Sequence, residues 1–153
     1  MASTSTKLMY LSKDYWSPRY DETFYSIQFE SNQRLDTSPV DVPPEMGGKT
    51  NHPAFYYQIH VFRGQTKHTI LRRYSHFQWL YQQIQDSLQT LQEQDDLMNA
   101  ELPPGTCPLH FQSDDFAKNR QKGLETFLKD LLDKSHFSSH PAVLVFLQLQ
   151  QLK

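Results

Sequence analysis

Two arginines and a tyrosine, Arg72-Arg73-Tyr74, stand where a predicted strand runs into a predicted helix. Guanidinium groups bind phosphate through paired, charge-assisted hydrogen bonds. The first turn of a helix adds backbone N–H groups and the positive end of the helix dipole. Ser75 and Gln78 fit the S-x-x-Q pattern of a capping box at this helix start. The segment therefore predicts a site for an anion such as phosphate, with solvated surface arginines as the alternative.

Arg120 is the second residue that points to anion chemistry. Phe116 precedes it and Leu124 follows it by four positions, so the three residues share one helix face. A guanidinium at the edge of an apolar face is costly unless an anion receives it. The alternatives are an aliphatic stem that covers apolar surface and a nearby carboxylate partner. Together with the Arg-Arg-Tyr segment, Arg120 predicts donors for a phosphate and its neighbouring hydroxyls.

The composition is that of one folded domain outside the secretory pathway. Of the 153 residues, 37% are hydrophobic and 13% aromatic, which is enough for a buried core. The formal net charge of −2 argues against the broad basic face that nucleic-acid binding needs. The single cysteine, Cys107, excludes an intramolecular disulfide. The chain contains neither an apolar run of about 20 residues nor a secretory signal, so we expect a cytoplasmic protein.

Alternating apolar and polar residues predict three strands, which we expect to form an antiparallel sheet. The strands cover residues 23–31, 55–61 and 67–74. A long loop, expected to be mobile, covers about 32–53, where prolines and glycines gather. Residues 1–20 are expected to be a tail that docks in part, and residues 21–153 to be the folded domain.

Apolar residues at helical spacing predict about three helices. One apolar face runs through Phe77, Leu80, Tyr81, Ile84, Leu88 and Leu91. The proline-rich segment 101–105 ends this region, because two prolines and a glycine do not continue a helix. Ser113 is expected to cap a second helix, and Pro141 to open a short third one. The fold class is α+β: a three-stranded antiparallel sheet packed against a helical subdomain with a proline-rich loop.

Taken in order, these segments resemble the phox-homology (PX) domains of sorting nexins. The second PX strand is similar to Tyr57-x-Ile59-x-Val61, and the third strand with the first helix is similar to residues 70–80. The proline-rich loop of the family is similar to Leu102-Pro103-Pro104 with Pro108. Its second helix is similar to Phe116-x-x-x-Arg120-x-x-x-Leu124-x-x-Phe127-Leu128. The resemblance implies that Arg73 contacts a 3-phosphate, that Tyr74 packs on the inositol ring, and that Arg120 holds inositol hydroxyls. We expect Arg72 and Ser75 to complete this headgroup site.

One element of the family pattern is absent from the sequence. PX domains that bind 3-phosphates carry a lysine after the proline-rich loop, which neutralises the 1-phosphate. Residues 105–111 contain neither lysine nor arginine. His110 is the nearest substitute and Lys118 is a second candidate. In the same segment Leu109 and Phe111 are candidates for insertion into the bilayer interface, with burial in the core as the alternative.

The resemblance implies a membrane-targeting adaptor that binds phosphatidylinositol 3-phosphate on endosomal membranes. The expected location is therefore the cytoplasm, with peripheral attachment to endosomes, and a cargo or coat protein is an expected partner. The rival hypothesis is a PX-fold protein-interaction module with weak or no lipid binding. His136 and His140 have the spacing of a helical metal pair, but no third ligand is evident. We expect no enzyme activity, metal or cofactor.

Overall fold

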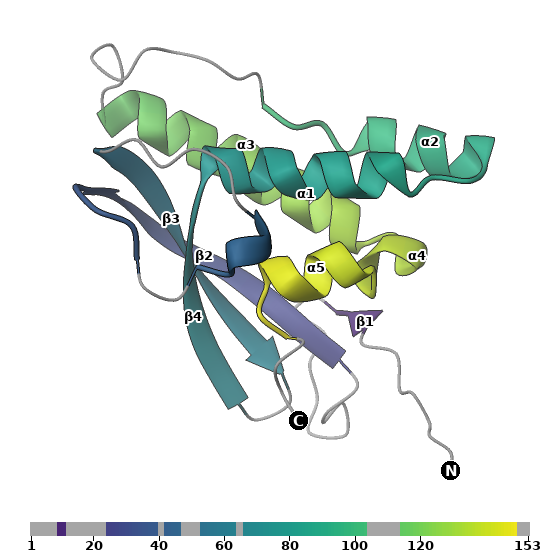
Figure 1. Cartoon of the computed structure of the whole chain (residues 1–153), viewed down its shortest axis with the longest axis horizontal. Coiled ribbons are helices and arrows are strands. Elements are labelled where there is room, and N and C mark those ends of the chain that lie inside the picture. The colour runs from purple at the N-terminus through teal and green to yellow at the C-terminus, as the bar shows by residue number, and fades with distance from the viewer. Residues whose placement is uncertain are drawn as a thin grey trace.

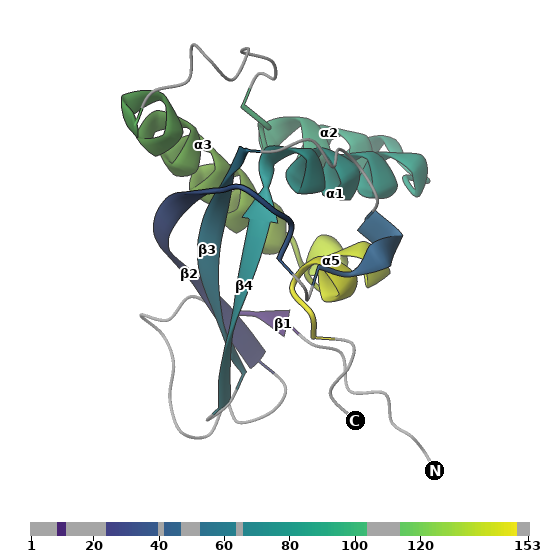
Figure 2. The same cartoon turned by 60° about the vertical axis from the view of Figure 1, so that its left-hand side comes forward.

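The computed structural model describes residues 9–11, 24–39, 42–46, 53–63, 66–103 and 114–149. A four-stranded sheet in the order β1-β2-β3-β4 carries the helices on one side (Figures 1 and 2). The strands are β1 (Met9–Tyr10), β2 (Phe24–Leu35), β3 (Ala54–Arg63) and β4 (Thr66–Arg73). β2, β3 and β4 are antiparallel, which confirms the predicted three-stranded sheet. The short β1 adds a parallel edge to β2.

β2 is longer than its sequence pattern indicates. Residues 32–35, which we expected in the loop, continue the strand and pair with the first residues of β3. The register shifts between Phe29 and Ser31, so Glu30 forms a β-bulge. A bulge moves later side chains out of the simple alternation, and the polar residues beyond it gave no strand signal. Within the same predicted loop, a 3-10 helix, η2 (Pro44–Met46), buries Met46.

Within the residues that the structure describes, five α-helices pack beside the sheet. They are α1 (Tyr74–Asp86), α2 (Leu91–Asn99), α3 (Asp114–Leu132), α4 (Ser135–Ser138) and α5 (Pro141–Phe146). The expectation of one continuous apolar helix face from Phe77 to Leu91 is wrong, because α1 ends at Asp86 and α2 begins a separate helix. Thr90 caps α2: its hydroxyl accepts a hydrogen bond from the backbone N–H of Glu93 at 3.0 Å. The motif Thr90-x-x-Glu93 is a capping signal that our prediction overlooked.

Aromatic side chains fill the space between the sheet and the helices. Phe77 of α1 packs edge-on against Phe146 of α5, with ring centroids 4.9 Å apart, and also contacts Tyr57 of β3. The hydroxyl of Tyr25 donates a hydrogen bond to the carbonyl of Ser138 at 2.5 Å, which joins β2 to α4. These contacts fix α1 on the sheet, and with it the junction between β4 and α1.

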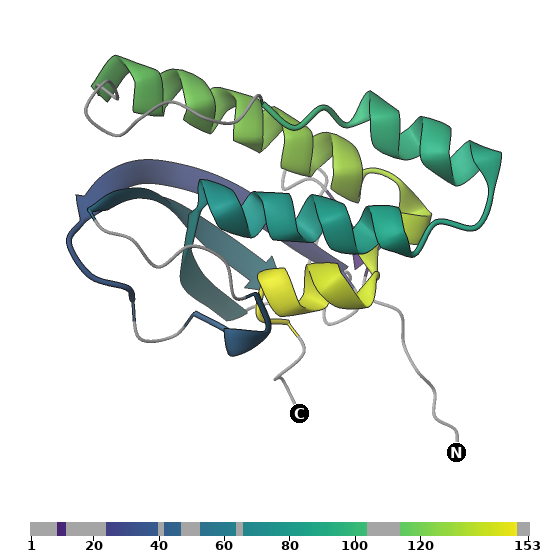
Figure 3. The same cartoon turned by 45° about the horizontal axis from the view of Figure 1, so that its top comes forward.

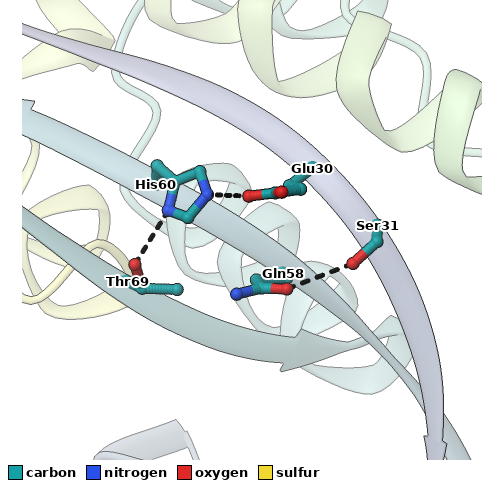
Figure 4. A network of polar contacts seen from close by, with 5 residues as sticks. All are labelled: Glu30, Ser31, Gln58, His60 and Thr69. Carbon is teal, nitrogen blue, oxygen red and sulfur yellow. Dashed lines mark hydrogen bonds and ion pairs between the residues drawn. The ribbon is translucent and has the colours of Figure 1, made fainter.

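A polar network fastens the strands on the outer face of the sheet (Figure 4). Nε2 of His60 on β3 contacts the carboxylate of Glu30 at the β2 bulge. Nδ1 of the same ring lies 2.8 Å from the hydroxyl of Thr69 on β4. Ser31 donates a further cross-strand hydrogen bond to Gln58 at 3.1 Å. The three strands are thereby joined by side chains as well as by their backbone ladder.

Candidate anion-binding site

Arg72 and Arg73 are neighbours in sequence but point to opposite faces of the sheet, because side chains alternate along a strand. Arg72 pairs with Tyr57 of β3, and Arg73 pairs with Tyr56. Both arginines are buried, with exposed fractions of 1% and 7%. The two guanidinium groups therefore have different surroundings and make different contacts.

Arg72 ties β4 to the end of α5. Its Nε donates to the carbonyl of Phe146 at 2.8 Å, and its Nη2 donates to the side chain of Gln148 at 3.0 Å. Nη1 donates to the carbonyl of Leu71 at 2.8 Å. The guanidinium carbon also lies 5.5 Å from the ring centroid of Phe146. We had expected Arg72 in the headgroup site, but these contacts assign it to the fold.

Arg73 caps the first turn of α1, which begins at Tyr74 rather than after Ser75. The backbone N–H of Arg73 donates to Nδ1 of His76 at 3.0 Å, so the predicted capping box of Ser75 and Gln78 is wrong by two positions. The guanidinium carbon of Arg73 lies 5.9 Å from the ring centroid of Tyr56. Its charge thus lies at the N-terminal end of α1, where the helix dipole also favours an anion.

His76 is held neutral beneath this helix start. Burial lowers the pKa of His76 to about 3, and the positive charges of Arg72 and Arg73 lower it in the same direction. A neutral ring can accept the Arg73 N–H at Nδ1, which an imidazolium could not do. In the same turn the Oγ of Ser75 is buried and has no hydrogen-bond partner within the described part of the chain.

Tyr74 and Arg120 form the second half of the site. The guanidinium carbon of Arg120 lies 4.1 Å from the ring centroid of Tyr74 and 4.6 Å from that of Phe116. Both distances are within the range of cation–π attraction. Arg120 shares a helix face with Phe116, as its spacing predicted, and two aromatic rings flank its charge. The side chain is half-buried and comes from α3, so the site joins two helices.

One further group positions Tyr74, and it was not expected from the sequence. The Tyr74 hydroxyl donates a hydrogen bond to the carbonyl of Pro103. Burial raises the pKa of the nearby Tyr57 to about 12, against the opposing effect of the Arg120 charge. Burial also raises the pKa of Tyr74, again opposed by Arg120. Both phenols therefore remain protonated at neutral pH, and the Tyr74 hydroxyl keeps its proton to donate.

Gly123 lets the proline-rich segment approach α3 closely. A Cβ added to Gly123 would lie 2.7 Å from Cγ of Pro103, a distance that real side chains do not reach. The glycine therefore permits the contact that places the Pro103 carbonyl beside Tyr74. In the helix interior a glycine is otherwise unfavourable, so close approach is the physical reason for it here.

The remaining candidates fall into two groups. His110, Leu109 and Phe111 lie outside the described residues, and Lys118 is exposed on α3, two positions before Arg120. His136 pairs with Asp96 at 3.1 Å. His140 caps α5, because its Nδ1 accepts a hydrogen bond from the N–H of Ala142 at 3.0 Å. Among the described residues no group of three or more His, Cys, Asp or Glu could hold a metal ion.

Comparison with known proteins identifies the family to which this geometry belongs. The model of the PX domain family matches residues 60–150, which is more than half of the chain. The chain belongs to the PX family. PX domains are phosphoinositide-binding, membrane-targeting modules and are generally non-catalytic. No curated protein sequence matches the chain with significance. In the described part of this PX domain, no helix is both long and apolar enough to span a bilayer.

Solved PX domains share the fold at low sequence identity. A designed CISK-PX domain is 21% identical and superposes with a TM-score of 0.60, covering 80% of this chain and 97% of its own. The mouse SNX19 PX domain with a bound sulphate ion is 20% identical, with a TM-score of 0.51, and covers 80% and 98% of the two chains. These matches confirm the α+β fold predicted from the sequence.

Proposed function

We propose that this PX domain binds phosphatidylinositol 3-phosphate on endosomal membranes through Arg73, Tyr74 and Arg120. The observation that carries the proposal is the stacking of the Arg120 guanidinium on Tyr74 at the end of β4. Arg120 and Tyr74 are 46 positions apart, and they meet beside the helix start that Arg73 caps. A cation, an aromatic face and a helix N-terminus are the groups that a phosphorylated sugar ring needs.

Each residue has a distinct part in the proposed complex. Arg73 holds the 3-phosphate at the positive end of α1, and Tyr74 packs against the inositol ring. Arg120 donates to the ring hydroxyls, for which its guanidinium is already placed above Tyr74. Ser75 adds a hydroxyl in the first turn that has no other partner among the described residues. The mouse SNX19 PX domain was solved with a bound sulphate ion, an anion that resembles phosphate in shape.

The sequence contains no lysine directly after the proline-rich loop that could neutralise the 1-phosphate of the lipid. We therefore assign this role to His110, with Lys118 as the second cation. A histidine is mostly neutral at pH 7. The affinity for the headgroup is therefore expected to increase as pH falls. Replacing His110 by lysine should strengthen binding by about tenfold at most, the upper range for a partly exposed ion pair. Insertion of Leu109 and Phe111 into the interface is the second source of membrane affinity in this proposal.

The deciding experiment compares two arginines on neighbouring strands. Arg73→Ala should lower affinity for liposomes with phosphatidylinositol 3-phosphate by about 30- to 150-fold, the loss of a charge-assisted contact of roughly 2 to 3 kcal/mol. Arg63→Ala removes the same charge at the other end of β3, seven ladder positions from the partner of Arg73, or about 23 Å. This control should bind like the parent protein.

Liposomes with unphosphorylated phosphatidylinositol and with phosphatidylinositol 4-phosphate complete the series. The proposal is wrong if Arg73→Ala and Arg63→Ala bind the 3-phosphorylated lipid equally well. A preference for the 4-phosphate would keep the site and overturn the headgroup assignment. The melting temperatures of both variants need to match that of the parent, so that loss of binding reports on contacts rather than on unfolding.

A further inference from the structure

An apolar hollow lies at the other end of α1 from the headgroup site. It has a volume of about 280 Å³ and is lined by Tyr81, Gln85, Leu88, Gln94, Leu97 and Met98. Met98 is 69% exposed, and Leu91 on the same helix is 78% exposed. Leu91, Gln94 and Met98 are spaced three and four positions apart, so they share one face of α2. Two large apolar side chains, Leu91 and Met98, are thus exposed to solvent at a hollow whose lining is mostly apolar.

At about 280 Å³ this hollow, called below the groove between α1 and α2, is at the lower limit of small-molecule sites, and its lining comes from α1, α2 and the link between them. Small-molecule pockets usually measure about 300 to 1,000 Å³. α1 and α2 run in opposite directions, joined by a four-residue link, as Figures 1 and 3 show. A third helix that lays its apolar face along such a pair is a common mode of peptide recognition. One or two anchor side chains of such a helix would fill this volume.

The charge around the groove selects the partner. Residues 81–98, which include every lining residue, contain four Asp or Glu residues and no Lys or Arg. Asp96 is paired with His136, whereas Asp86 at the end of α1 and Asp95 on α2 are exposed. An apolar groove with an acidic rim is complementary to an apolar helix face flanked by lysine or arginine. The same rim repels an anionic bilayer, which argues against the membrane as the occupant.

We propose that the groove between α1 and α2 is a docking site for a basic amphipathic helix of a partner protein. None of its lining residues belongs to the proposed headgroup site, and Tyr81 lies two helical turns along α1 from Tyr74. A partner helix and a lipid headgroup can therefore be held at the same time. The inference is independent of which phosphoinositide the other end binds.

The probe is an 18-residue synthetic helix with leucines along one face and lysines on the other, labelled for fluorescence anisotropy. Its twin carries glutamates in place of the lysines. The lysine peptide should bind the full chain at least about tenfold more tightly than the twin at low salt, because the acidic rim attracts one and repels the other. Backbone amide shifts on titration should map to residues 81–98.

Two substitutions test the groove itself. Leu91→Gln with Met98→Gln removes both exposed apolar side chains and should weaken the lysine peptide by roughly tenfold or more. Both positions are exposed, so the melting temperature should stay unchanged. Asp95→Lys should weaken the lysine peptide by about two- to fivefold. Asp36→Lys makes the same charge change at the residue after β2 and should have no effect. The end of β2 lies at the far end of the molecule from α2 (Figures 1 and 3).

Each other result overturns the proposal. Equal binding of the two peptides removes the charge argument, and shifts outside residues 81–98 place the peptide elsewhere. Weaker binding of the double variant to vesicles of phosphatidylcholine and phosphatidylserine would assign the groove to the membrane. A dimer of the parent that the double variant abolishes would assign it to a second copy of this chain. If the double variant does not fold, the comparison of Asp95→Lys with Asp36→Lys decides.

Discussion

Arg72 shows that a basic residue in a phosphate-binding motif can be a residue of the core. Its guanidinium is almost fully buried and donates to the carbonyls of Phe146 and Leu71 and to the side chain of Gln148. Gln148 has a positive φ of 56°, an unfavourable backbone conformation for a side chain other than glycine. The hydrogen bond from Arg72 helps to hold this residue in place, and so fixes the end of α5 against β4.

Arg72→Met should therefore destabilise the fold. The substitution leaves the buried carbonyl of Phe146 and the half-buried side-chain oxygen of Gln148 without their donor, at a cost of about 3 kcal/mol in the free energy of unfolding. Urea denaturation followed by circular dichroism measures the change. Lys67→Met removes one charge from an exposed position on the same strand and should change stability by less than about 0.5 kcal/mol. Equal stability of the two variants would contradict the structural role of Arg72.

His76 makes the stability of the fold depend on pH. Its pKa is about 3 in the folded protein and about 6.5 when unfolded, so between these values only the unfolded chain binds the proton. The free energy of unfolding should thus decrease as pH falls below 6.5, by at most about 1.4 kcal/mol per pH unit. Burial also lowers the pKa of His140, which adds a slope of the same sign.

The contribution of His76 can be isolated by His76→Asn. Asparagine keeps an acceptor for the Arg73 N–H but does not titrate. Urea midpoints at pH 7.5, 6.0 and 5.0 should fall more steeply for the parent than for this variant. Parallel slopes would show that His76 does not set the acid sensitivity.

At the scale of elements, the close packing of Pro103 on α3 positions the aromatic face of the site. Tyr74 donates to the carbonyl of Pro103, and Pro103 reaches α3 only because residue 123 has no side chain. Pro103 thus contacts both Gly123 of α3 and Tyr74, the first residue of α1. We therefore expect a change at Gly123 of α3 to move Tyr74, although Gly123 is not one of the proposed headgroup contacts.

Gly123→Ala separates helix stability from lipid binding. Alanine favours a helix by up to about 1 kcal/mol over glycine. Here the added Cβ displaces Pro103, so we expect little net gain in stability and a several-fold loss of phosphoinositide affinity. Lys122→Ala improves helix propensity at the adjacent exposed position without a clash. It also removes the positive charge of Lys122, and headgroup binding should change by no more than the loss of that charge explains. Liposome binding and melting temperature, measured together, check both statements.

The sequence predicted strands and long helices well because their signals are local. Alternation in β3 and helical spacing in α3 are properties of consecutive residues. The end of β2 beyond Glu30 could not be read in this way, because it depends on pairing with residues 54–57. The break between α1 and α2 was readable from Thr90 and Glu93, but apolar spacing through Leu91 concealed it.

The site was predictable in its residue types and less so in its contacts. The motif indicated Arg73 and Tyr74 as candidates, and helical spacing predicted that Arg120 shares a face of α3 with Phe116. The opposite orientation of Arg72 follows from strand alternation, which a motif does not take into account. The contacts of Tyr74 with Pro103 and Arg120 span 29 and 46 positions, and only the tertiary fold reveals such pairs.

For the molecule as a whole, membrane affinity should exceed headgroup affinity. We expect Leu109→Ser with Phe111→Ser to weaken binding to liposomes strongly, since burying each side chain contributes about 1.5 to 3 kcal/mol. Affinity for soluble inositol 1,3-bisphosphate and the melting temperature should remain nearly unchanged. A fall in melting temperature would mean that the two residues belong to the core instead.

Charge is unevenly distributed along the sequence, because residues 74–99, which contain α1 and α2, carry four Asp or Glu residues and no Lys or Arg. The start of α1 lies towards one end of the longest axis of the molecule and α2 towards the other (Figures 1 and 3). Near an anionic bilayer the first end is attracted and the second repelled, over a Debye length of about 8 Å at physiological ionic strength. If the chain binds such a bilayer as proposed, we expect this repulsion to orient it before contact, so that salt acts mainly on the rate of encounter. The proposed contacts of Arg73, Tyr74 and Arg120 would then set the residence time on the membrane.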